Sequence, residues 1–212
     1  MLRVVKTFLL NQIYKISNPS ILYGDDGDDY IGFSDGYIFM RVTSWANDRL
    51  EENYNSICMD KTGKEKFATK YNITSNYNSG IAIGYYSDNF MQPKTLAGLD
   101  KDGKELWTVE NVNEYESQSD GVIIYQDRDS SLYGAVDLKG NNVLECEYEK
   151  LTRAGNGLIG FKKYGLWGYL DYKGNEVIKP QFSNAQKFSG GIALVEKDSK
   201  QYIINTKGRN RN

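Results

Sequence analysis

One turn sequence recurs five times along the chain at a nearly constant spacing. The copies are Asp60–Gly63, Asp100–Gly103, Asp137–Gly140, Asp171–Gly174 and Asn205–Gly208, and the last two steps between them are equal. Asp or Asn accepts a hydrogen bond from the backbone two residues later, and the glycine supplies a positive φ. The pattern predicts five hairpin turns, and a near-constant repeat length is typical of a tandem array.

A second glycine opens a short apolar run between successive turns. The copies are Gly36–Met40, Gly80–Gly84, Gly121–Tyr125, Gly157–Phe161 and Gly191–Val195. Two further short runs flank each turn, so each repeat predicts three strands. The expected fold is all-β: a tandem array of about five antiparallel three-stranded repeat units, arranged as an open propeller or as a solenoid.

The repeat between residues 163 and 197 resembles the bacterial WG β-repeat. The matching elements are Trp167-Gly168, Asp171, Gly174, Val177-Ile178, Pro180, Phe182, Ala185, Phe188 and Gly191. The Trp-Gly pair becomes Tyr133-Gly134 and then Ala97-Gly98 in the preceding units, while the turns and the glycine-led strands cover roughly residues 36–208. The resemblance implies a bacterial β-repeat array without established catalytic residues.

The chain is expected to comprise an N-terminal segment, residues 1–20, and a WG-like repeat domain, residues 21–212. Apolar residues recur in the segment at intervals of three and four, which fits an amphipathic helix or an irregular cap that Pro19 ends. The apolar stretch Phe8–Leu10 is too short for a signal peptide, and no run is long enough to span a membrane. The expected location is the cytoplasm, with the cell envelope or secretion as alternatives.

The composition excludes several classes of function. The chain contains no histidine, which removes Ser-His-Asp and Cys-His catalysis and His-ligated zinc. The net charge is −2, and charges of both signs are interspersed, unlike the basic footprint of a nucleic-acid binder. Cys58 and Cys146 lack metal-ligand spacing and are expected to be reduced and buried. We therefore expect no enzyme, no cofactor and no nucleic-acid partner.

Clusters of acidic residues are candidates for metal or catalytic sites. The segment Gly24–Asp29 has the charge to hold calcium, but it lacks the ligand spacing of an EF-hand, and a solvated turn is the favoured interpretation. The pairs Asp127 with Asp129 and Glu114 with Glu116 each lie on one strand face. Such pairs suit acid–base chemistry, but they are more often a solvated face, so no catalytic or metal-binding residue is assigned.

Trp167 has two competing interpretations. In a strand, Trp167, Tyr169 and Asp171 share one face, and Gly168 and Leu170 share the other. The ring could stack on sugars or bases. Alternatively it packs between repeats, with the glycine permitting close approach. Packing is favoured, and Trp167 is predicted to be mostly buried against an adjacent unit.

One connection lengthens steadily towards the N-terminus. It joins the glycine-led strand to the strand before the turn, and it is shortest in the last two units, where its length is the same. From the last unit to the first, the spans that contain it are Gly191–Tyr202, Gly157–Gly168, Gly121–Gly134, Gly80–Gly98 and Gly36–Ile57. The two minimal connections are expected only to link strands.

The longer connections contain residue types that are common in interface hot spots. They are Trp45, Arg49, Tyr54, Tyr85, Tyr86, Phe90, Met91 and Arg128. If the units stack in register, these connections lie on one edge. The alternative is that their aromatic side chains cover the core.

The predicted function is a non-catalytic protein-interaction module of a bacterial cell, such as an inhibitor or immunity-type partner, acting through these N-terminal connections. The alternative is a carbohydrate- or envelope-binding module that uses the 17 Tyr and 3 Trp as stacking platforms.

Overall fold

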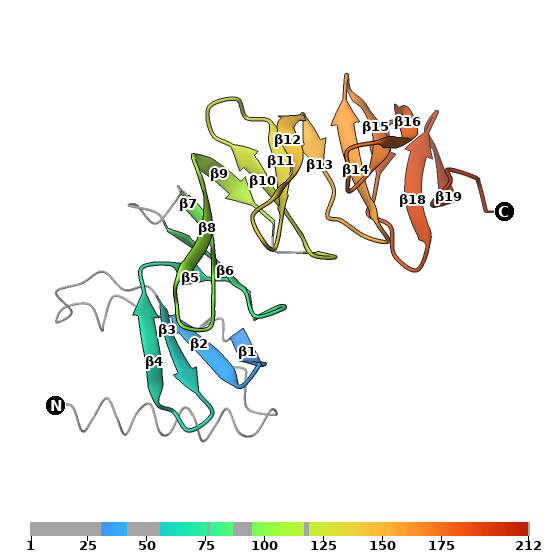
Figure 1. The fold of residues 1–212 in the computed structure, drawn as a ribbon. Helices are drawn as coiled ribbons and strands as arrows, with labels where there is room; N and C mark the ends of the chain where they lie inside the picture. Colours follow the sequence, from blue (N-terminus) through green and yellow to red (C-terminus); the bar gives the residue numbers. More distant parts are fainter. Residues whose placement is uncertain (1–30, 42–55, 76, 87–94, 117–118, 212) are drawn as a thin grey trace. The chain divides into compact units, whose positions relative to one another are not determined.

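The computed structural model describes residues 31–41, 56–75, 77–86, 95–116 and 119–211. These residues form 19 strands and no helix, and the strands make five antiparallel sheets in chain order (Figure 1). The expected all-β tandem array is thereby confirmed. The N-terminal segment 1–20 and the acidic cluster Gly24–Asp29 lie outside the described residues. Within the described part, no helix could cross a membrane.

Within each sheet the strands lie side by side in the order in which the chain forms them. Sheets 1 and 2 contain β1 (Ile31–Ser34), β2 (Tyr37–Arg41), β3 (Ser56–Asp60), β4 (Glu65–Thr69), β5 (Asn72–Ile73), β6 (Ala82–Tyr86), β7 (Thr95–Leu99) and β8 (Glu105–Glu110). Sheet 3 contains β9 (Val112–Tyr115), β10 (Val122–Asp127), β11 (Tyr133–Asp137) and β12 (Asn142–Tyr148). Sheets 4 and 5 contain β13 (Lys150–Leu151), β14 (Leu158–Lys163), β15 (Leu166–Asp171), β16 (Glu176–Phe182), β17 (Asn184–Ala185), β18 (Ile192–Lys197) and β19 (Lys200–Asn205).

Sheets 1 to 4 each have four strands, one more than the three predicted for each repeat, and sheet 5 has three. The additional strand comes before the glycine-led strand, as β13 does when Lys150 and Leu151 pair with Lys162 and Phe161 of β14. In sheets 2 and 4 this strand has only two residues, which is too few to produce an alternating pattern. A four-stranded antiparallel meander is the form of a propeller blade.

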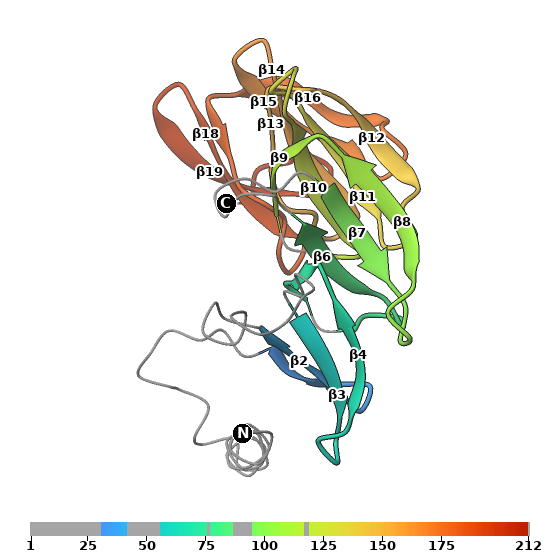
Figure 2. The ribbon, with the colours of Figure 1, turned by 90° about the vertical axis from the view of Figure 1, so that its left-hand side faces the viewer.

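The chain divides into two compact units, residues 1–86 with 99–105, and residues 87–98 with 106–212. In the second unit, sheets 3, 4 and 5 stack face to face (Figures 1 and 2). Ile159 and Phe161 of sheet 4 join the apolar cluster shared with sheet 3, whereas Tyr169 and Ile178 join the cluster shared with sheet 5. Sheet 4 is therefore buried on both faces. In the first unit, the Phe39 ring contacts the rings of Phe67 and Tyr77.

The recurring Asp-x-x-Gly sequence forms the predicted hairpin turn. In the fourth copy, the N–H of Gly174 donates to the carbonyl of Asp171 (3.1 Å), and the N–H of Asp171 donates to the carbonyl of Asn175 (2.9 Å). The Asp171 carboxylate accepts the N–H groups of Lys173 and Asn175, each at 2.9 Å. All the turn glycines have positive φ, from 75° to 81°, which confirms the assignment and the repeat register.

Successive sheets are joined at these turns by one recurring contact. The residue seven positions after the turn aspartate lies beneath the turn glycine of the next sheet. The pairs are Phe67 with Gly103, Trp107 with Gly140, Leu144 with Gly174, and Ile178 with Gly208. The turn glycine thus serves two purposes, a positive φ and space for a neighbouring side chain.

The hydrogen bonds of the turn make stability depend on pH. The Asn175 side chain and the backbone N–H groups hold the pKa of Asp171 below its usual range, and the Thr62 side chain and backbone do the same for Asp60. A carboxylate with a lowered folded-state pKa stabilises the fold above its unfolded pKa of about 4, and this contribution is lost as the pH falls. We expect Asp60→Asn/Asp171→Asn to have a lower Tm than the wild type at pH 7 and a smaller difference at pH 3. Circular dichroism melts test this; a difference independent of pH would contradict it.

Both cysteines are free, as predicted. Cys58 is fully buried, and burial raises the pKa of its thiol to about 11. Cys146 is only half-buried, contrary to the expectation that both are buried. It lies against Gly134, where an added Cβ would be 2.7 Å from the Cys146 sulfur.

Candidate interaction surface

The connection that lengthens along the chain joins the same two strands in every sheet. It comprises residues 42–55 in sheet 1, 87–94 in sheet 2, 128–132 in sheet 3, 164–165 in sheet 4 and 198–199 in sheet 5. In the second unit, the last three project from the same end of the stacked sheets (Figure 1). The first two, with Trp45, Arg49, Tyr54, Phe90 and Met91, lie outside the described residues.

Arg128 is exposed at the tip of a hydrogen-bonded loop between β10 and β11. Its N–H donates to the carbonyl of Asn111 (2.8 Å). The Asp127 carboxylate accepts the N–H of Ser130 (2.8 Å) and its hydroxyl (2.7 Å), and these bonds lower the pKa of Asp127. Ser131 completes the loop with a φ of 58°. The loop therefore presents Arg128 from an ordered backbone.

Tyr85 and Tyr86 end strand β6 and are half-buried. The ammonium group of Lys70 lies 5.5 Å from the centre of the Tyr86 ring and 5.2 Å from that of Tyr71. This cation–π arrangement holds one side of the Tyr86 ring and leaves part of it accessible. Tyr86 therefore covers neighbouring side chains on one side, and its accessible part leaves room for the predicted contact role.

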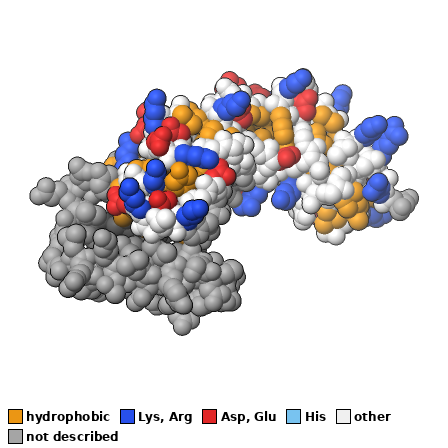
Figure 3. Space-filling view, turned by 60° about the horizontal axis from the view of Figure 1, so that its bottom comes forward, with side chains coloured by type: hydrophobic (Ala, Val, Ile, Leu, Met, Phe, Trp, Pro, Cys, Tyr) orange, Lys and Arg blue, Asp and Glu red, His pale blue; other side chains and the backbone are white. Residues whose placement is uncertain are grey.

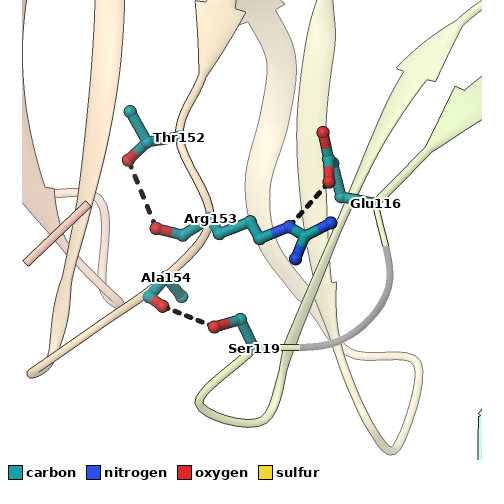
Figure 4. A network of polar contacts seen from close by, with 5 residues as sticks. All are labelled: Glu116, Ser119, Thr152, Arg153 and Ala154. Carbon is teal, nitrogen blue, oxygen red and sulfur yellow. Dashed lines mark hydrogen bonds and ion pairs between the residues drawn. The ribbon is translucent and has the colours of Figure 1, made fainter. Parts of the chain in front are cut away.

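Two of the carboxylates considered for acid–base chemistry, Glu114 and Glu116, make structural contacts. The Glu114 carboxylate accepts a hydrogen bond from the hydroxyl of Tyr133, and Glu116 forms an ion pair with Arg153 at 2.7 Å. Figure 4 shows Arg153 reaching towards Glu116, while the Ser119 hydroxyl donates to the carbonyl of Ala154 (2.8 Å). These contacts join sheet 3 to the segment that precedes β14. Among the described residues, no three Cys, Asp or Glu side chains gather as metal ligands.

Trp167 shares a face with Tyr169 and packs against the apolar cluster between sheets 4 and 5, as predicted. The residue keeps a minor part of its surface exposed, which agrees with the prediction of a mostly buried Trp167. Gly168 is required by close packing, because an added Cβ would lie 2.5 Å from the carbonyl oxygen of Ile178. Strand β16 bulges here, since Trp167 pairs with Phe182 and Tyr169 pairs with Ile178.

Trp107 connects two sheets, a role that the sequence did not reveal. Its ring nitrogen donates to the carbonyl of Leu138 (2.8 Å), and its ring fills the space that a Cβ on Gly98 or Gly140 would occupy. The sequence alignment of the repeats was also wrong at Gly98. This glycine stands two residues before its turn aspartate, whereas Gly134 and Gly168 each stand three residues before theirs.

Ala97 is therefore the true counterpart of Gly134 and Gly168. The sheet 2 connection, measured from Gly80, ends at Ala97 and is one residue shorter than the span to Gly98 that the sequence suggested. Glycine at position 98 is instead explained by close packing, because the Trp107 ring fills the space that a Cβ would occupy there.

The sheets define a class of protein, the tandem β-repeat, whose units are antiparallel meanders joined by recurring turn contacts. Residues 133–167 and 167–200 match the model of the WG containing repeat. The chain therefore carries two adjacent WG repeats over residues 133–200, which confirms the resemblance. No curated protein sequence matches the chain.

Several solved structures are similar to this chain in fold. A eukaryotic initiation factor aligns over 89% of the chain with a TM-score of 0.55 and 11% identity. KlHsv2 with loop 6CD replaced by a Gly-Ser linker aligns over 86% (TM-score 0.45, 10% identity), and BamB from Moraxella catarrhalis over 90% (TM-score 0.35, 14% identity). The chain spans 64% of the KlHsv2 structure, 54% of the initiation factor and 75% of BamB. At these identities the likeness concerns the fold alone.

Proposed function

We propose that the protein is a non-catalytic protein-interaction module of a bacterial cell, and that it acts in the cytoplasm as an inhibitor or immunity-type partner. The observation that carries the proposal is the connection between the glycine-led strand and the strand before the turn. The sheets repeat closely, but this connection grows from the tight turns 198–199 and 164–165 in sheets 5 and 4 to the long segment 42–55 in sheet 1. In repeat proteins, insertions into one connection gather on one face, which is often the binding face.

The composition of the connections supports binding to a protein. Trp45 and Tyr54 are aromatic, and Arg49 and Arg128 are cationic, and these residue types dominate binding energy in protein interfaces. Arg128 is exposed on an ordered loop, so little backbone conformational entropy would be lost when it contacts a partner. The alternative, a glycan-binding module, relies on the same aromatic side chains and is separated from this proposal by the experiment below.

We expect Trp45→Ala/Tyr86→Ala/Arg128→Ala to weaken partner binding at least about tenfold while the Tm changes little. The measurement is quantitative affinity capture from the source cells, with wild-type and variant baits compared in parallel. A partner enriched by the wild type and lost with the variant supports the proposal. Its affinity is then measured with purified proteins.

The control is Lys61→Ala/Lys104→Ala, which alters two exposed residues at the opposite, turn-bearing ends of sheets 1 and 2. This variant is expected to retain the partner. Intact binding by the loop variant together with a lower Tm would show that these side chains cover the core. Binding to a glycan array without a stoichiometric protein partner would favour the carbohydrate alternative.

A further inference from the structure

Tyr164 stands at a position where a tyrosine disfavours folding. It is the first central residue of the two-residue β14–β15 turn, with a φ of 54°, and Gly165 follows with a φ of 77°. Such turns favour Asn, Asp or Gly, because other side chains are strained at positive φ. The Tyr164 side chain is 87% exposed and therefore contributes little burial to offset the strain.

Like charges oppose each other at the same ends of sheets 4 and 5. Lys150 of β13 is the direct partner of Lys162 in β14, and Lys197 of β18 is the direct partner of Lys200 in β19. Directly opposed like charges destabilise an antiparallel pair. Departures from local folding rules are expected chiefly at functional sites, and three of them occur here together.

These residues form one surface because sheets 4 and 5 meet beside them. Trp167 of sheet 4 and Tyr202 of sheet 5 pack, half-buried, against the same apolar cluster. The Trp167 backbone pairs with Lys162 on one side and with Phe182 on the other. Next to Phe182, the Gln181 side chain accepts a hydrogen bond from the Lys197 ammonium group at 3.2 Å. We call this surface the cationic tip; it comprises Lys150, Lys162, Tyr164, Trp167, Lys197 and Lys200.

Charge is distributed unevenly along the second unit. Residues 150–211 contain 12 Lys and Arg and four Asp and Glu, a difference of +8, whereas residues 112–149 contain two and nine, a difference of −7. Figure 3 shows Lys and Arg side chains around the C-terminal end of the chain, with acidic side chains mostly over the preceding sheets. Sheets 4 and 5 thus attract a negatively charged partner, and sheet 3 repels one.

We infer that the cationic tip binds a short acidic segment of a partner protein. The lysines supply the charge, and Tyr164 and Trp167 supply the aromatic contact area that anchors protein interfaces. The inference rests on the proposed function and deepens it, because the tip lies at the ends of sheets 4 and 5 that carry the corresponding connections. These minimal connections therefore do more than link strands.

The neighbouring acidic sheet favours a short protein segment over a long polyanion. Glu147 lies 3.7 Å from Lys163, and Glu149 accepts the N–H of Gly165, so carboxylates border the tip on the side of sheet 3. A nucleic acid that extended beyond the tip would meet the acidic residues of sheet 3. An acidic segment of a few residues avoids sheet 3 and meets four lysines of the tip, against which stands Asp198 of the β18–β19 turn.

The test uses the full chain and a fluorescein-labelled heptapeptide of six glutamates with one central phenylalanine, and binding is followed by fluorescence anisotropy at low salt. Lys162→Gln/Lys200→Gln is expected to weaken binding of this peptide about tenfold. The matched control, Lys173→Gln/Lys207→Gln, removes the same charge from exposed turns at the opposite ends of sheets 4 and 5 and is expected to change affinity less than about twofold. Equal losses in the two variants would overturn the inference, as would wild-type affinity no better for this peptide than for its glutamine analogue.

Tyr164→Asn separates binding from folding. Asn suits this turn, so the variant is expected to melt at a temperature equal to or above that of the wild type while binding the peptide about three- to tenfold more weakly. Unchanged binding would show that Tyr164 does not contact the peptide and would contradict the aromatic role inferred for it. Tighter binding of the wild type to a short single-stranded oligonucleotide than to the peptide would overturn the choice of a protein segment.

Failure of this inference is distinguishable from failure of the proposed function. If the cellular partner is captured by the Lys162→Gln/Lys200→Gln and Tyr164→Asn variants as well as by the wild type, but is lost with the N-terminal connection variant, the proposed function stands and the tip plays no part. If the tip variants no longer capture the partner, and the partner's binding site is acidic, the proposed function and the inference about the cationic tip are both supported.

Discussion

Gly140→Ala is expected to destabilise the protein by about 4 kcal/mol, more than a surface turn substitution ordinarily costs. Two effects combine at this position. Gly140 has a φ of 79°, where a residue with a Cβ is strained by about 1–2 kcal/mol. The new Cβ would also lie 2.4 Å from the Trp107 ring, and overpacking of this kind costs about 1–3 kcal/mol.

Gly174→Ala is the matched control, because it adds the same strain without the overlap. Gly174 has a φ of 80°, and an added Cβ would lie an ordinary 3.6 Å from the Leu144 side chain. We expect a cost of about 1–2 kcal/mol. Urea unfolding of both variants measures the difference. Equal destabilisation would show that Trp107 moves aside freely and that the space under the turn glycine does not matter.

The turns and the glycine-led strands could be predicted because their sequence rules are local. Asp171 and Gly174 supply the hydrogen bond and the positive φ that the turn requires, so the hairpin can be predicted from these residues without any other part of the molecule. The fourth strand could not be predicted in the same way. Lys150 and Leu151 are a strand only because β14 lies beside them, and two residues carry no alternation of their own.

The contacts between sheets were only partly visible in the sequence. A glycine at the Trp-Gly position suggested close packing, and Gly168 indeed lies against the Ile178 carbonyl. The partner of Trp107 could not be found this way, since its ring crosses to Leu138 and Gly140 in the turn of the next sheet. One signal was available: Trp107 stands seven positions after its turn aspartate, as Leu144 and Ile178 do.

The candidate surface shows a different limit of sequence patterns. The lengths of the connections indicated a surface in the N-terminal repeats. They gave no indication for Tyr164, because its connection has the minimal length. Only the structure shows that Tyr164 has a strained backbone and an exposed side chain. A residue that neither packs nor suits its turn is better explained by what it binds than by how the chain folds.

The two tryptophans of the described sheets are expected to differ in their contribution to stability. Trp107→Ala should cost about 4 kcal/mol, because it removes a partly buried ring that packs against both Gly98 and Gly140, together with the hydrogen bond to Leu138. Trp167 is also partly buried, and it packs against one apolar cluster. Trp167→Ala should cost about 2 kcal/mol, because it does not remove the hydrogen bond and the glycine contacts that Trp107 makes.

Trp107→Phe distinguishes the ring from its hydrogen bond. Phenylalanine keeps most of the apolar contact and lacks the N–H donor, so about 1–2 kcal/mol should be lost, including the cost of leaving the Leu138 carbonyl without that donor. Chemical unfolding of the three variants, followed by circular dichroism, gives the order of stability. Trp107→Ala should also reduce the cost of Gly140→Ala, because the overlap with the ring then disappears. Additive costs of Trp107→Ala and Gly140→Ala would contradict this explanation, as would a larger loss of stability for Trp167→Ala than for Trp107→Ala. Either result would indicate that the repeats are joined mainly through the Trp-Gly strand and not through the contact beneath the turn glycine.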